Sequence, residues 1–260
     1  MTSDAYTPPE QIVSKLDVTP SDLLLVGSDV LQLAVQIRAA GGQFDANAFI
    51  DDLLAKLGPE GTLLFPTFNF DFCRGETFDV RTTPTAMGSL PRAALKRADF
   101  RRTKHPLHSF VVAGKHQDEI CALENVSSTG TGSPFEFMLN NNGKMIIIGL
   151  PMQGAFTFAH YVEETEGVDF RYHKEFTSTY IDYDGKSDER TYTLYVRDLE
   201  RGVLSDLNPM QEILVQENVV FEKVINGISF LQLRFRETYP YIVQDIRENG
   251  GKSLYRLESD

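Results

Sequence analysis

The sequence predicts a single three-layer α/β domain, built on a mixed central sheet and followed by a late antiparallel hairpin. Short apolar runs typical of buried strands alternate with helical patterns before residue 165. Two segments of alternating polar and apolar residues then flank a turn-forming sequence, as in a β-hairpin. The 260 residues, with 42% hydrophobic content, suffice for one such domain over residues 1–260.

Local patterns predict the elements of the N-terminal half. Thr67 to Phe72 carries aromatic residues at alternate positions, which is typical of a half-buried strand or of an aromatic wall beside a substrate. Residues 73–87 have no clear period and are interpreted as a long loop. Ser89 is expected to cap a helix at 90–97. The other expected elements are helices at 10–16, 31–37 and 46–57 and strands at 23–26 and 61–66.

The C-terminal half predicts more antiparallel pairing. Ser133 suits the N-cap and Pro134 the first position of a helix that Gly143 closes. The hairpin is expected from the strands 172–182 and 190–196 around 183–188. The remaining expectations are strands at 110–113, 144–150, 219–224 and 228–235, helices over 208–216 and 241–248, and a helix that carries His160 and Glu163.

Composition limits the function classes. The net charge of −12 argues against nucleic-acid and anionic-membrane partners and is compatible with a cationic small substrate. No stretch is long and apolar enough to span a bilayer, no signal peptide is recognisable, and two cysteines are too few for a disulfide framework, so a cytoplasmic protein is expected.

One segment departs from the acidic average. We call Arg92, Lys96, Arg97, Arg101, Arg102 and Lys104 the basic island, since only Asp99 opposes them within residues 92–104. A cluster of Arg and Lys is a candidate phosphate site. A solvated helix face is the alternative.

His160 and Glu163 form the candidate catalytic pair. They follow a buried strand and a turn with Pro151 and Gly154, and on a helix their spacing places both side chains on one face. A histidine there can accept a proton near neutral pH, and the carboxylate can orient it. A buried histidine satisfied by a local acid is the alternative reading of the same spacing.

Five segments together resemble the aminoglycoside 3-N-acetyltransferase family. They are Gly58-Pro-Glu-Gly-Thr-Leu-Leu-Phe-Pro-Thr67, Thr83-Pro-Thr-Ala-Met-Gly-Ser-Leu-Pro91, His105-Pro-Leu-His-Ser109, Gly132-Ser-Pro134 and Thr157-Phe-Ala-His-Tyr-Val-Glu163. The resemblance covers roughly residues 20–240. It implies an α/β/α sandwich that transfers an acetyl group from acetyl-CoA to an amine of an aminoglycoside or amino sugar. His160 then matches the catalytic histidine and Glu163 the acid that follows it.

The resemblance also implies a CoA site. The segments 83–91 and 105–109 match parts associated with it, and the basic island joins them. The expected CoA contacts are Ser28, Thr83, Met87, Gly88, Ser89, Arg101, Arg102, Lys104, His105 and Ser109. One departure concerns Gly27-Ser28-Asp29, where family members usually carry a histidine and serines. Another is the Phe170 to Phe176 run, which resembles the surface-polysaccharide and amino-sugar branch more than the antibiotic-resistance enzymes.

The residues permit direct transfer in a ternary complex. No cysteine or serine stands in a recognisable nucleophile motif, and the oxyanion donors stay open among Ser109, Thr157 and the backbone near Gly154. Aromatic and acidic side chains suit a polar ring that carries amines. A nucleotide-linked acceptor would favour basic residues such as Arg171 or Lys174. The expected acceptor contacts are Phe70, Asp71, Thr157, Glu164 and Tyr172, with Phe68, Phe72 and Asp169 nearby; the aromatics are alternatively core residues.

Two other classes are compatible with the residues. A metal hydrolase could use His105, His108, His160 and Glu163, although no H-E-x-x-H motif is present, and no metal is expected. A non-catalytic module that binds CoA or a sugar is the second. The oligomeric state stays open, and a homo-oligomer is compatible with the sequence.

Overall fold

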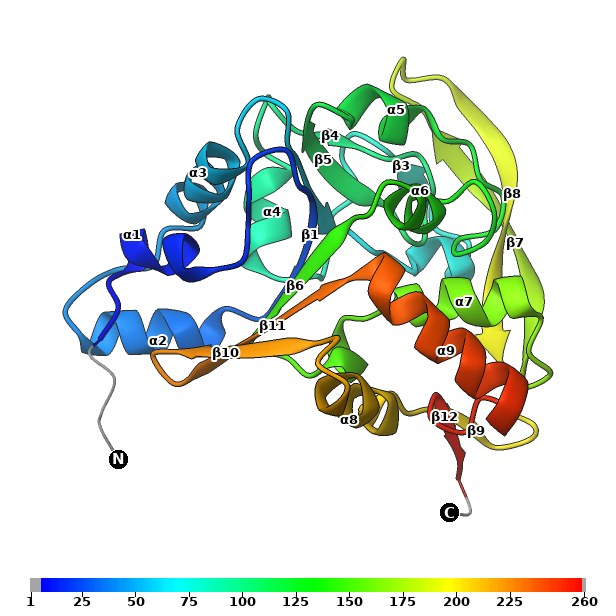
Figure 1. Ribbon diagram of the computed structural model, residues 1–260. Helices are drawn as coiled ribbons and strands as arrows, with labels where there is room; N and C mark the ends of the chain where they lie inside the picture. Colours follow the sequence, from blue (N-terminus) through cyan, green and yellow to red (C-terminus); the bar gives the residue numbers. More distant parts are fainter. Residues whose placement is uncertain (1–5, 259–260) are drawn as a thin grey trace.

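The computed structural model describes residues 6–258, in which a seven-stranded mixed sheet is flanked by helices on both faces (Figure 1). The strand order is β10-β11-β6-β1-β2-β5-β4. The three central strands β6, β1 and β2 are parallel, and the outer pairings are antiparallel. The strands are β1 (Leu23–Ser28), β2 (Thr62–Pro66), β4 (Arg101–Arg102), β5 (Phe110–Gly114), β6 (Lys144–Ile148), β10 (Phe221–Ile225) and β11 (Ile228–Arg234).

Successive residues of the central strands enter two separate cores. On β1, Leu24 and Val26 pack with the helices of one face, whereas Leu23 and Leu25 pack with those of the other. Side chains alternate between the faces of a strand, so a continuous apolar run requires cover on both sides. One layer contains α1 (Pro9–Ile12), α2 (Leu31–Ala39), α3 (Ala46–Leu57) and α4 (Ser89–Ala94); the other contains α5 (Gln117–Ala122), α6 (Pro134–Asn140), α7 (Phe158–Glu166), α8 (Asn208–Gln216) and α9 (Phe235–Asn249).

The late hairpin forms a sheet of its own. The strands β7 (Arg171–Ile181) and β8 (Ser187–Arg197) pair antiparallel along their whole length, as predicted. β3 (Phe78–Asp79) adds to β7 in parallel. A further antiparallel pair joins β9 (Val203–Ser205) to β12 (Tyr255–Leu257). In Figure 1 the hairpin stands beside α7, on the side of the molecule opposite α2.

Three local predictions are corrected. Residues 67–70 form no strand, and a 3-10 turn over Asp71–Arg74 follows them. Gly88, not Ser89, is the N-cap of α4, and this helix ends at Ala94 because the chain turns there toward β4. The last helix begins at Phe235, although Pro240 lies inside it. A proline inside a helix removes one backbone hydrogen bond and crowds the carbonyl four residues before it, and the packing of the buried Phe235 against α6 and α7 offsets this cost.

The described helices include none that is long and apolar enough to cross a membrane. The single domain over residues 1–260 stays a prediction.

Candidate active site

A buried carboxylate links His160 to the hairpin. His160 lies in the first turn of α7, and its Nδ1 is 2.6 Å from Oε2 of Glu163, one helical turn later. The same oxygen is 2.7 Å from Nε of Arg171, the first residue of β7. The Glu163 side chain has no exposed surface, whereas a quarter of the His160 side chain is exposed, at 25%. The pair therefore has a fixed inner end and an accessible outer end.

This geometry assigns the protonation of the His160 ring. A carboxylate accepts hydrogen bonds, so Nδ1 carries the hydrogen that Glu163 receives. In the neutral ring Nε2 is then the acceptor nitrogen. Thr157, the N-cap of α7, lies half-buried one turn before His160, on the same side of the helix. An imidazole held in this tautomer can take a proton from a molecule bound at its exposed edge.

Glu164 stands beside the pair and faces the hairpin as well. Its Oε2 accepts a hydrogen bond from Thr129 at 2.7 Å, and its Oε1 lies 3.0 Å from Nε2 of His173. His173 is half exposed and sits two residues after Arg171, on the same face of β7. Two neighbouring side chains of β7 therefore contact two neighbouring acids of α7.

The aromatic side chains divide between core and surface. Phe68 and Phe72 are buried, and Phe72 packs edge-on against Tyr192. Phe70 and Tyr172 remain exposed, at 41% and 50%. Phe68 and Phe72 therefore belong to the core, whereas Phe70 and Tyr172 are accessible to an acceptor.

The charged acceptor candidates differ in availability. Asp71 forms an ion pair with Arg74, and Asp169 lies 3.4 Å from Arg201. Both carboxylates are partly exposed and could exchange these partners for an ammonium group. Arg171 is buried against Glu163, so it is not free to bind an anion of an acceptor, as its sequence position had suggested.

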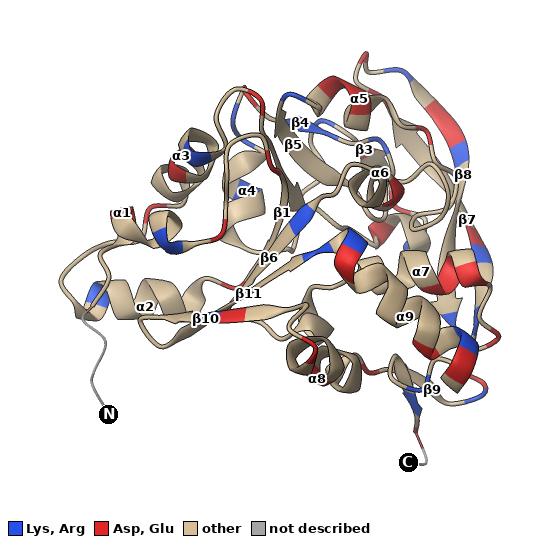
Figure 2. Cartoon of the chain, in the orientation of Figure 1, with Lys and Arg blue, Asp and Glu red and all other residues tan. Residues whose placement is uncertain are grey.

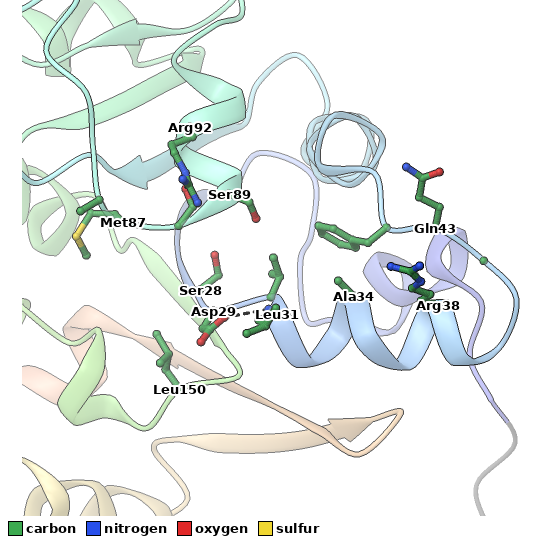
Figure 3. Close-up of a pocket in the computed structure, with 15 residues that line it drawn as sticks. Ser28, Asp29, Leu31, Ala34, Arg38, Gln43, Met87, Ser89, Arg92 and Leu150 are labelled. Atoms are coloured by element: carbon green, nitrogen blue, oxygen red, sulfur yellow. Dashed lines mark hydrogen bonds between the residues drawn. The ribbon is translucent and has the colours of Figure 1, made fainter.

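A cleft of about 1050 Å³ opens beside the ends of β1 and β6. Figure 3 shows α2 on one side and the start of α4 on the other, with Ser28 between them and Leu150 beyond the start of α2. The hydroxyl oxygen of Ser28 is buried and has no hydrogen-bond partner among the described residues. The lining includes four residues that the sequence predicts as CoA contacts, namely Ser28, Met87, Gly88 and Ser89.

Two arginines, Arg38 and Arg92, line the cleft. Arg38 comes from the last turn of α2, and Arg92 comes from α4, where its Nε donates to the Gly88 carbonyl at 2.9 Å. Both side chains are labelled in Figure 3. Arg92 belongs to the basic island, whereas Arg38 was not among the residues predicted from the sequence. A single exposed arginine at a helix end is common, so the sequence around Arg38 does not mark it as a binding residue.

The rest of the basic island lies elsewhere. Figure 2 shows the arginines of β4 at the sheet edge, far from α2. Arg101 pairs with Asp118 and stacks on Tyr183, and Lys104 pairs with Glu124 at 2.6 Å. These residues do not line the cleft, so their predicted phosphate contact has no support from this geometry.

Arg102 is enclosed within the protein. Its guanidinium is buried and donates to the Ser109 hydroxyl, the Thr83 carbonyl and the Thr67 carbonyl. Burial lowers its pKa to about 10. Ser109 is fully buried, and Thr83 does not line the cleft. In the structure these three residues hold the 83–109 region together, and their contact with CoA stays a prediction.

His105 is likewise enclosed. Its Nε2 is 3.2 Å from the Val126 carbonyl, and its Nδ1 accepts from the Leu107 amide at 3.2 Å. Burial lowers its pKa to about 4, and burial also lowers the pKa of His108 well below its usual value. The ring of His108 packs edge-on against Phe68 and Phe70. Among the described residues, no three His, Cys, Asp or Glu side chains are grouped so that they could hold a metal ion.

Comparison with known proteins identifies the family. Residues 36–246 match the aminoglycoside 3-N-acetyltransferase family. Aminoglycoside N(3)-acetyltransferase III of Serratia marcescens is 28% identical over 167 residues, which are 57% of this chain and 60% of that protein, so the alignment spans less than two thirds of the relative.

Two solved structures share the fold. Aminoglycoside acetyltransferase AAC(3)-IIb has a TM-score of 0.77 at 20% identity over 94% of this chain and 97% of its own. AAC-IIIb, in a binary structure with CoASH, has a TM-score of 0.77 at 15% identity over 94% of this chain and 98% of its own. At such identities these structures show the α/β/α architecture alone. The family match covers most of the chain, and the protein therefore belongs to the aminoglycoside 3-N-acetyltransferase family.

Proposed function

We propose that the protein transfers the acetyl group of acetyl-CoA to an amine of an aminoglycoside or amino sugar, with His160 as the general base. The observation that carries this proposal is the hydrogen bond between His160 and the buried Glu163, which leaves the other ring nitrogen at an accessible edge. Family membership supports the reaction class.

The chemistry requires a proton acceptor at this place. An aliphatic ammonium is not a nucleophile until it loses a proton, and Nε2 of His160 can receive it. Glu163 then stabilises the imidazolium that forms, as the acid does in hydrolase triads. The neutral amine attacks the thioester carbonyl and forms the C–N bond. Collapse of the tetrahedral intermediate breaks the C–S bond, and the second proton of the nitrogen passes to the departing thiolate, so the products are the N-acetyl amide and CoA thiol.

The cleft between α2 and α4 is the proposed CoA site. It lies past the carboxyl ends of β1 and β6, where open α/β sheets bind ligands. Arg38 and Arg92 supply positive charge for phosphates, and the partnerless Ser28 hydroxyl can bind a polar group. Leu150 of the cleft and Thr157 before α7 belong to one connecting segment, so this segment joins the cleft to the base. The AAC-IIIb structure with CoASH supports CoA as the co-substrate.

A covalent acetyl-enzyme is disfavoured. Burial raises the pKa of Cys73 to about 11 and that of Cys121 to about 12. Both thiols are therefore protonated near neutral pH and are poor nucleophiles. Direct transfer within a ternary complex is the proposed route.

The acceptor is proposed to be an amine on a sugar ring. Phe70 and Tyr172 are exposed aromatic surfaces for a ring face, and Asp71 provides a partly exposed carboxylate for an ammonium group. Glu164 is 8% exposed and would bind an ammonium group in exchange for its contact with His173. Aminoglycosides and biosynthetic amino sugars share this chemistry. The Phe170 to Phe176 run favours the biosynthetic amino sugar slightly.

An amine screen tests the proposal. The purified protein is incubated with acetyl-CoA and aminoglycosides, nucleotide-linked amino sugars, arylamines or peptide N-termini, and the release of CoA thiol is followed. Turnover with an amino sugar or aminoglycoside supports the proposal. Turnover confined to arylamines or peptides would reject the acceptor class, and acetyl-CoA binding without thiol release from any amine would indicate a non-catalytic module.

A further inference from the structure

We propose that Arg171 is a positioning residue whose buried positive charge keeps Glu163 ionised and sets the pH at which His160 becomes a base. This inference rests on the proposed role of His160. It gives the hairpin a role in positioning the catalytic pair, in addition to its proposed role in the acceptor site. The geometry behind it is a continuous line of three side chains, from Arg171 through Glu163 to His160.

The Arg171 guanidinium is held from three directions. Its Nε lies 2.7 Å from Glu163 Oε2, as an ion pair that does not have the geometry of a hydrogen bond. Its Nη1 donates to the Tyr195 carbonyl of β8 at 3.2 Å, and its Nη2 donates to the Ser205 hydroxyl of β9 at 2.7 Å. The side chain is 5% exposed, so it has little room to reorient. Residues of three strands thus aim one fixed charge at the carboxylate behind the base.

Glu163 needs this counter-charge. Its carboxylate is fully buried, and Oε1 has no hydrogen-bond partner among the described residues. An isolated buried carboxylate would take up a proton, because burial disfavours the charged form. A protonated Glu163 would be a weaker acceptor for the Nδ1 hydrogen of His160 and would stabilise the imidazolium less. The neighbouring arginine favours the ionised carboxylate.

The same charge acts on His160 through Glu163. The Arg171 guanidinium and the His160 ring contact the same carboxylate oxygen, so the two groups share one negative charge. Removal of a nearby positive charge raises the pKa of every group around it, whichever of the two coupled groups takes the proton. Other titratable or charged groups surround this line, and all remain when Arg171 is replaced: His108, Glu164, Asp169, His173, Tyr195 and Arg197.

The test uses variants of the full enzyme that differ in the positive charge at position 171. Arg171→Met removes this charge, and Arg171→Gln removes the charge but retains a donor for the Tyr195 carbonyl. Arg171→Lys keeps a positive charge at the position. Arg247→Met is the matched control, because Arg247 pairs with Glu166 at the far end of α7 but is 67% exposed, where solvent screens the charge.

Two readouts separate positioning from mere support of the fold. The first is the pH profile of kcat/KM for the amine, and the second is an NMR titration of the His160 ring, identified among the five histidines with His160→Asn. Met and Gln are expected to raise the pKa of His160 and the acid limb of the profile by about one unit or more. Lys is expected to return both close to the wild-type values, and Arg247→Met is expected to move neither.

Each outcome decides the matter. If activity falls in the Met and Gln variants while the His160 titration stays in place, Arg171 only supports the fold and the proposal is overturned. If the Met and Gln variants fail to fold, Ser205→Ala is a milder variant, because it removes only the acceptor of Arg171 Nη2, and a smaller rise in the pKa of His160 is expected. An unchanged His160 titration in every folded variant also overturns the proposal. A shifted titration together with a fully active His160→Asn enzyme would instead reject His160 as the base and leave the electrostatic link intact.

Discussion

Nε of Arg102 donates a hydrogen bond to the Ser109 hydroxyl, at 2.9 Å, in the interior of the protein. Both residues belong to segments that the sequence associates with CoA, and the hydrogen bond shows how they contribute. Arg102 also binds the Thr67 and Thr83 carbonyls, so it links β4 to the segments before β5 and α4. The basic groups that line the cleft are Arg38 and Arg92 instead.

The first prediction separates these two sets of arginines. Arg38→Ala and Arg92→Ala are each expected to raise KM for acetyl-CoA about tenfold or more, the size of a lost charge-assisted hydrogen bond to phosphate. Arg101→Ala and Lys104→Ala are the matched controls and are expected to change KM little. Steady-state kinetics with acetyl-CoA and with its dephospho form checks this. A KM effect found only in the controls would return the phosphate site to β4.

The second prediction concerns the base. His160→Ala is expected to lower kcat by about 100-fold or more, the usual range for a lost general base, with little change in acetyl-CoA affinity. His116→Ala is the control, because that histidine pairs with Glu119 on α5, remote in the fold from α7. Calorimetric binding and single-turnover rates give the two quantities. Wild-type turnover in a folded His160→Ala enzyme would remove His160 from the mechanism.

The third prediction concerns stability at the buried carboxylate. Glu163→Ala leaves Arg171 buried without its partner, and the free energy of unfolding is expected to fall by about 3 kcal/mol or more. Glu166→Ala, on the same helix, breaks a pair with the exposed Arg247 and is expected to cost clearly less. Urea denaturation of both variants measures the difference. Equal decreases in the free energy of unfolding would show that the buried ion pair contributes no more to stability than the exposed one.

The fourth prediction concerns acid. Burial holds the pKa of His105 at about 4 in the folded protein, below the value near 6.5 of an unfolded chain. Between these two values the unfolded state binds more protons, so stability is complete above about pH 6.5 and is lost as the pH falls toward 4. The pKa of His108 is lowered as well, so it adds to the loss over the same descent.

The variant His108→Phe tests this pH dependence. A phenyl ring can occupy the place between Phe68 and Phe70 and has no proton to bind. The fall in melting temperature from pH 7 to 5 is expected to be shallower than in the wild type. Identical slopes in the wild type and His108→Phe would contradict the assignment.

The sequence alone determined the layered architecture and the pairing of His160 with Glu163. The period of apolar residues reports which face of an element is buried, so the helices at 46–57 and 208–216 were predicted to the residue and the hairpin strands within three residues. The spacing of His160 and Glu163 likewise fixes a shared helix face, because neighbours three apart always meet there.

Only the tertiary structure decided which charged side chains are buried and which line the cleft. Arg102 and Arg38 are the same residue type, yet one is enclosed by three acceptors and the other lines a cleft. Alternating aromatics likewise did not reveal that Phe72 packs in the core while Phe70 is exposed. Arg171 reaches Glu163 from a strand whose docking on α7 no local pattern encodes. Burial and pairing of charge depend on contacts between distant segments, and local sequence carries no record of those contacts.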